Sequence, residues 1–176
     1  KDLDDIIDNE MKSYEDAIEK IDELPGIGKR SAEVIIAEIG IDMSRFPTAA
    51  HLASWSGLCP GNNESAGKRK SGKTNKGNKH LKSILVQCAK AAKSNKDSFF
   101  HAQYQRLVVK RGANRATVAV AHSMLIAIYH MLKDKVPYKN LGSDYYTKFN
   151  TETKAKYYFK KLQELGVSVP VSLTTA

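Results

Sequence analysis

The stretch Ala116-Thr-Val-Ala-Val-Ala-His-Ser-Met-Leu-Ile-Ala-Ile-Tyr-His-Met-Leu132 is apolar on nearly every side of a helix. A helix that lacks a polar face is buried, which predicts that this stretch forms the centre of the domain. His122 and His130 lie on it, and we expect both to be packed and hydrogen-bonded rather than to bind a ligand. The other long segments are amphipathic and strand signals are almost absent, so the sequence predicts an all-α fold.

Shorter segments with helical spacing of apolar residues surround this central helix. In the predicted helix over residues 80–94, Leu81, Leu85 and Cys88 fall on one side, and Lys79, Lys82, Lys90 and Lys93 on the other. Trp55 lies among apolar residues and is expected in the core. The remaining predicted helices cover residues 3–23, 29–39, 47–57, 96–111 and 152–165.

We divide the chain into an arm helix at the end of a coiled coil over residues 1–23, a central domain over 24–138 and a C-terminal extension over 139–176. The end from Gly166 onward is expected to be a loose tail. Because the chain begins inside a helical pattern and without Met, we expect it to be part of a longer protein.

Composition favours a folded, basic domain. The chain has 176 residues, of which 41% are hydrophobic, and its formal net charge of +9 favours an anionic partner such as nucleic acid. Cys59 and Cys88 have no metal-binding spacing and predict no disulfide. This use of cysteine favours a reduced, cytoplasmic location. No apolar run reaches transmembrane length, so we expect no membrane partner.

The most basic segment is a glycine-rich loop over residues 61–79 that contains Ser65 and Ser71. No acidic residue occurs between Ser65 and Lys96, so the charge of this segment is not neutralised within it. We therefore expect it to bind phosphates, and a serine in such a field is a candidate nucleophile toward phosphorus. The cationic residues of the loop and the following helix are Lys68, Arg69, Lys70, Lys73, Lys76, Lys79 and Lys82.

A second candidate contact is the turn Leu24-Pro-Gly-Ile-Gly28 between two predicted helices. Residues 14–40 resemble a helix-hairpin-helix motif, in which backbone N–H groups near a helix N-terminus bind a phosphate without reading bases. We expect Gly26, Gly28 and Lys29 to make this contact. A plain turn between helices, with glycines present only for geometry, is the alternative.

Two other patterns are weaker. Residues 67–74 match the spacing of a nucleotide-binding P-loop, but a turn precedes them and a loop follows, whereas a P-loop needs a strand before and a helix after. The match is therefore interpreted as accidental. Tyr145-Tyr146 would suit a tyrosine recombinase, but no surrounding set of Arg and His accompanies the pair.

An ordered series of short motifs points to a family. Leu24-Pro-Gly-Ile-Gly28, Ala37-Glu-Ile-Gly40, Gly57-Leu58, Glu64-Ser65 and Lys76-Gly-Asn78 follow one another, together with Arg45-Phe46, Ala53, Pro60, Leu81-Lys82 and Val136-Pro137-Tyr138. Over residues 20–138 this order resembles the C-terminal transposase domain of the IS110 group of bacterial insertion-sequence recombinases, the bridge-RNA-guided serine transposases.

The resemblance implies a DNA transposase whose nucleophile is Ser65, with Ser71 as the fallback. Ala66 departs from the pattern, since a glycine often occupies this place and here follows as Gly67. Magnesium is expected in the full-length protein, bound by carboxylates of a missing RuvC-like N-terminal domain and not by this fragment, which should be inactive alone. The implied partners are DNA, a structured guide RNA and further copies of the chain. A non-catalytic nucleic-acid-binding module is the alternative.

Overall fold

The structure is a computed structural model that describes residues 3–61, 63–148 and 151–166. It divides into two compact units, Lys1–Ser143 and Asp144–Ala176. The first unit carries helices α1 to α7 and a two-stranded hairpin, and the second carries α8 (Tyr145–Lys148) and α9 (Thr151–Glu164). A few side chains within these ranges lie outside the description: those of Asp4, Asn63, Glu64, Arg69, Lys70, Ser71 and Glu152.

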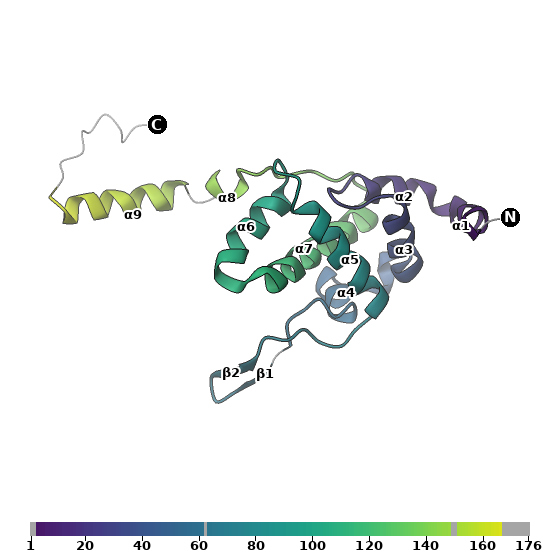
Figure 1. The fold of residues 1–176 in the computed structure, drawn as a ribbon, viewed down its shortest axis with the longest axis horizontal. Helices are drawn as coiled ribbons and strands as arrows, with labels where there is room; N and C mark the ends of the chain where they lie inside the picture. The colour runs from purple at the N-terminus through teal and green to yellow at the C-terminus, as the bar shows by residue number, and fades with distance from the viewer. Residues whose placement is uncertain (1–2, 62, 149–150, 167–176) are drawn as a thin grey trace. The chain divides into compact units, whose positions relative to one another are not determined.

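The centre of the first unit is α7 (Ala113–Asp134), which packs against α4 (Ala49–Trp55), α5 (Lys79–Ala92) and α6 (Phe99–Arg111) (Figure 1). Its buried positions confirm the central helix expected from the sequence. Among the described residues, α7 is the one helix long and apolar enough to cross a membrane, but half of that window is buried inside the unit, as in a core helix. The fold is therefore all-α apart from the short hairpin.

The N-terminal segment differs from the single helix predicted over residues 3–23. It forms α1 (Leu3–Met11), a 3-10 turn at Lys12–Tyr14 and α2 (Glu15–Asp22). Ile18 and Ile21 of α2 are buried, whereas Leu3 and Ile6 of α1 are exposed. Apolar spacing therefore continues through the segment while the helix does not.

The turn between α2 and α3 (Lys29–Ile39) lies against the C-terminal end of α5. Gly26 has φ +88°, and a Cβ atom there would lie 2.4 Å from the Ala92 nitrogen and 2.5 Å from the Cys88 carbonyl oxygen. Only glycine permits this approach. The two helices and their turn are thus formed as expected, and their assignment as a phosphate-binding helix-hairpin-helix stays a prediction.

The faces of α5 are confirmed, with Leu81, Leu85 and Cys88 buried. Both cysteines are free. Trp55 was expected in the core, but its side chain is 43% exposed and contacts the Phe46 ring. The buried residues of α4 are Leu52 and Ala53, so the helix turns another face to the core.

The two histidines of α7 also depart from the core role expected for them. His130 is exposed and pairs with Asp134, with its Nδ1 atom 3.3 Å from the carboxylate oxygen, and His122 is half-buried.

Candidate nucleic-acid interface

The glycine-rich loop folds as an antiparallel hairpin, contrary to the absence of strands expected from the sequence. Strand β1 (Asn63–Ser65) pairs with β2 (Lys68–Ser71), and Ser65 stands opposite Lys68. The connecting residues Ala66 and Gly67 have φ values of +51° and +73°, as in the two-residue turns that suit the twist of a hairpin. The strands contain no apolar residue, so the sequence pattern gave no strand signal. We call residues 59–75 the basic hairpin.

The arms of the basic hairpin are fixed where they join the helices. The Gly61 N–H donates to the Lys73 carbonyl at 2.8 Å, the Asn75 N–H to the Cys59 carbonyl at 3.2 Å, and the Asn78 N–H to the Trp55 carbonyl at 3.1 Å. Beside these bonds, the backbones of Gly57 and Gly77 touch so closely that neither position has space for a Cβ atom. We call residues 56–61 and 73–78 the hairpin base.

Side chains tie the hairpin base to two helices. The Asn78 side chain accepts a hydrogen bond from the Leu81 N–H and so caps α5, while its amide nitrogen donates to Glu38 of α3. Lys82 of α5 donates to the Thr74 hydroxyl. Because α3 and α5 are themselves packed together, these contacts hold the base against the rigid part of the unit.

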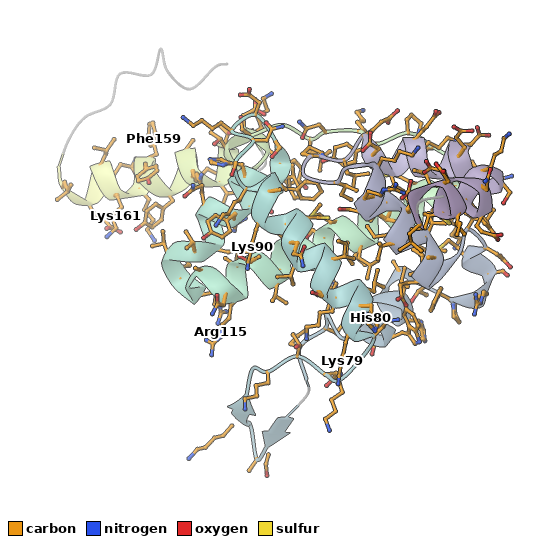
Figure 2. All side chains as sticks on the ribbon, turned by 45° about the vertical axis from the view of Figure 1, so that its right-hand side comes forward. Lys79, His80, Lys90, Arg115, Phe159 and Lys161 are labelled. Atoms are coloured by element: carbon orange, nitrogen blue, oxygen red, sulfur yellow. The ribbon has the colours of Figure 1, made fainter. Side chains whose placement is uncertain are left out.

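The predicted phosphate-binding lysines are distributed along this assembly. Lys68 lies at the tip, Lys73 in the base, Lys76 before α5 and Lys79 in its first turn, all exposed. Lys82 is half-buried and serves the base contact just described. Arg69 and Lys70 lie in β2, with side chains outside the description. Figure 2 shows Lys79 and His80 at the start of α5, where the hairpin leaves the helices.

The two candidate serines occupy different levels of the basic hairpin. Ser65 is exposed beside the turn, and its hydroxyl has no hydrogen-bond partner among the described residues. Ser71 pairs through its backbone position with Asn63, nearer the base. Lys73 stands opposite Gly61, four residues from Ser65 along the first arm, which corresponds to about 13 Å in a strand. Lys68 is thus the lysine that register places beside Ser65.

Gly26, Gly28 and Lys29 are not brought to the basic hairpin. The turn that contains them abuts the C-terminal end of α5, whereas the hairpin joins the N-terminal end, about 20 Å away along the helix axis. Lys29 lies 3.8 Å from the Asp8 carboxylate at the start of α3. The described surroundings there are acidic, with Glu15, Glu19, Asp22 and Glu33 lining the same depression.

A groove of about 1120 Å³ runs beside the hairpin base. Of its lining residues, only Lys73 is among the phosphate contacts predicted from the sequence. The groove is lined by Leu58, Pro60, Gly72, Lys73, Thr74, Gln103, Arg111, Asn114, Arg115, Val118, Ala119, His122 and Ser123. The pair Arg111 and Arg115 around Gly112 was the available signal, but only the fold shows that it faces Lys73.

No group of three or more His, Cys, Asp or Glu side chains suited to bind a metal occurs among the residues that the structure describes. The described part of the chain therefore offers exposed cations and a serine hydroxyl, without a ligand set that fits magnesium.

Residues 18–105, half of the chain, match the model of a family described as the Transposase IS116/IS110/IS902 family. The chain belongs to this family. The matched residues of this transposase family extend from α2 into α6 and include the whole basic hairpin with Ser65.

Two curated relatives align over a longer region. An uncharacterized 43.6 kDa protein of insertion element IS110 from Streptomyces coelicolor is 32% identical over 120 residues, which are 66% of this chain and 29% of that protein. A transposase for insertion sequence element IS1111A from Coxiella burnetii is 29% identical over 135 residues, 73% of this chain and 36% of that protein. The chain thus spans about a third of the length of the relatives it matches.

Proposed function

We propose that this chain is a DNA-binding part of a transposase that supplies a serine nucleophile for strand cleavage and rejoining. The observation that carries the proposal is the position of Ser65, exposed at the tip of a cationic hairpin whose base is fixed to two helices. The transposase family of the chain and the Coxiella burnetii relative named as a transposase support DNA as the substrate.

The proposed step is a transesterification at phosphorus. The Ser65 oxygen forms a bond to a DNA phosphorus while the bond from phosphorus to the 3′ oxygen breaks. The serine proton goes to a base, and the leaving 3′ oxygen gains a proton. Lys68 and Arg69 belong to the strand that faces Ser65, and their cations would stabilise the charge that develops on the phosphate oxygens. Reversal of the step on another 3′ hydroxyl rejoins a strand.

Magnesium chemistry is not assigned to this chain, since the described residues contain no group that fits the ion. The carboxylate ligands implied by the family resemblance would come from another domain of the longer protein. A structured guide RNA and further copies of the chain, together with a cytoplasmic location, belong to the same proposal. The exposed cations of the hairpin and of α5 are suited to the backbone of either nucleic acid.

The second candidate is a non-catalytic nucleic-acid-binding module, in which Ser65 only contacts a phosphate. This second candidate is favoured by the Ser65 hydroxyl, which has no hydrogen-bond partner among the described residues. No described side chain is therefore placed as the base that would activate it. In this chain alone the two candidates behave alike. They differ only in covalent chemistry carried out by the longer protein.

The deciding experiment uses the longer parent protein with a nicked suicide DNA, magnesium and its guide RNA. Mass spectrometry compares the wild type with Ser65→Ala and with Ser71→Ala, the matched change in the same hairpin. We expect a protein–DNA adduct on Ser65 that only Ser65→Ala abolishes. An adduct that survives both changes refutes both serines as the nucleophile. Failure to form any adduct, in a preparation that binds DNA, favours the non-catalytic binding module.

A further inference from the structure

The groove beside the hairpin base combines three kinds of surface. We call its exposed cations Lys73, Arg111 and Arg115 the rim, and its half-buried apolar residues Val118 and Ala119 the wall. The half-buried polar residues Gln103, His122 and Ser123 are called the floor. None of the described lining residues is acidic. Pockets of about 300–1,000 Å³ hold a drug-sized ligand, so a groove of about 1120 Å³ has space for a few nucleotides and not for a duplex.

The rim suits phosphate groups. Arg111 ends α6 and Arg115 lies in the first turn of α7, brought together by Gly112 at φ +78°. Both side chains are exposed, and neither pairs with an acidic group among the described residues. Figure 2 shows Arg115 pointing outward on the side from which the hairpin projects. The first N–H groups of α7 point to the same end, and Gly112 has no side chain to cap them.

The floor suits an uncharged ring with polar edges. The Gln103 amide nitrogen donates to the Ser123 hydroxyl at 2.7 Å, while the Gln103 amide oxygen is buried without a hydrogen-bond partner among the described residues. His122 is half-buried beside them, and burial lowers the pKa of its imidazole, which favours the neutral form at pH 7. A neutral imidazole and an amide can bond to the edge of a base, and apolar side chains can pack on its face.

We propose that the groove binds an unpaired nucleic-acid strand, with phosphates on Arg111 and Arg115 and one base inserted against Val118 and Ala119 toward Gln103. The proposal rests on the proposed function for its ligand class and adds a site apart from Ser65. From the Pro60–Thr74 pair to Ser65 the hairpin extends about 16 Å. The groove and Ser65 are thus separated by about that distance along the hairpin, so the two sites are distinct.

The test measures binding of the 176-residue chain to a fluorescein-labelled twelve-nucleotide strand by anisotropy, with a duplex of the same sequence for comparison. The variant is Arg111→Gln with Arg115→Gln. The control is Lys133→Gln with Lys135→Gln, which removes the same charge at the other end of α7. We expect the arginine variant to lose tenfold or more in affinity for the single strand, at least five times the control's loss, and less than threefold for the duplex.

The salt dependence gives a second measure of the phosphate contacts. Two lost contacts on a single strand reduce the slope of log affinity against log salt by about 1.4. DNA and RNA versions of the strand identify the source of the ligand, and a selective loss on either supports the site. Equal losses on single strand and duplex, or a loss no larger than the control's, overturn it.

An abasic strand tests the inserted base. We expect the wild type to bind the base-containing strand about tenfold more tightly, in the range of a stacked base. Ala119→Leu fills the wall and should reduce this preference below twofold, with thermal unfolding to verify the fold. An unchanged preference overturns the base contact. Ser65→Ala should bind as the wild type does, so loss of the covalent adduct and loss of groove binding are separate results.

Discussion

The contact between Gly57 and Gly77 makes Gly77→Ala the sharpest test of the hairpin base. Gly77 does not have a positive φ, so alanine is acceptable to its backbone and only space opposes it. The new Cβ atom would lie 2.3 Å from the Gly57 nitrogen and 2.6 Å from the Gly57 Cα atom. Since both obstacles are backbone atoms, no side-chain rotation relieves them.

The cost follows from these distances. Non-bonded carbon contacts are most favourable at about 3.5–4.0 Å, so the two arms must separate by about 1 Å. Overpacking of this kind costs about 1–3 kcal/mol. The separation also weakens the adjacent bond from Asn78 to Trp55, which adds about 1 kcal/mol. We therefore expect a loss of about 2–4 kcal/mol, and at about 3 °C per kcal/mol the Tm falls by about 6–12 °C.

The assay is thermal unfolding followed by circular dichroism, with Gly72→Ala as the control. A Cβ atom at Gly72 meets nothing within 4 Å, and its φ is not positive. This control should melt as the wild type does or slightly higher, because alanine restricts the unfolded chain. Gly77→Ala melting within about 2 °C of Gly72→Ala would refute the close contact and the fixed base derived from it.

Three further changes test the hairpin and the core. Ala66→Gly removes the strain of an alanine in the left-handed region, at φ +51°. Because glycine also loses more entropy on folding, the net stabilisation of the turn should be about 0.5 kcal/mol. Amide exchange over residues 63–71 should therefore slow about twofold, and faster exchange would contradict this turn. Asn78→Asp keeps the α5 cap but places a second carboxylate beside Glu38. The variant should be less stable than the wild type at pH 7, and its stability should approach that of the wild type at pH 4, where the carboxylates become protonated. A stability difference that does not change with pH counts against the contact. Burial raises the pKa of Tyr138 to about 12 from 10. Its contribution to stability is therefore present below pH 10 and lost as the pH rises toward 12, and Tyr138→Phe should lose less stability than the wild type between pH 9 and 11.5 in urea unfolding.

The helices could be predicted because their apolar spacing reports burial directly. The bounds of α3 agree with the prediction over 29–39, and the apolar run from Ala116 to Leu132 is the core of α7. Spacing does not identify the partner surface. The apolar spacing of residues 3–23 includes both exposed Ile6 and buried Ile18, and it gives no sign of the helix break between them.

The basic hairpin could not be predicted because its strands are polar and charged and contain no apolar residue. Their pairing is set by the turn at Ala66 and Gly67 and by backbone bonds at the base, neither of which produces an alternating apolar pattern. The groove was hidden for a different reason. Its lining residues come from the basic hairpin and its base, from α6 and from α7. Only the folded unit brings these three segments to one groove.

The short motifs behind the family resemblance gain a common physical role in the structure. Glu38 binds Asn78, Gly57 packs on Gly77, and Asn78 caps α5, so separate motifs meet at the hairpin base. Flexible lysines bind phosphate adequately from a loosely held loop. In-line attack at phosphorus is more demanding, because a small displacement of the attacking oxygen costs orders of magnitude in rate. A hairpin fixed at its base limits the movement of Ser65, which is the physical reason for proposing a nucleophile rather than a non-catalytic contact.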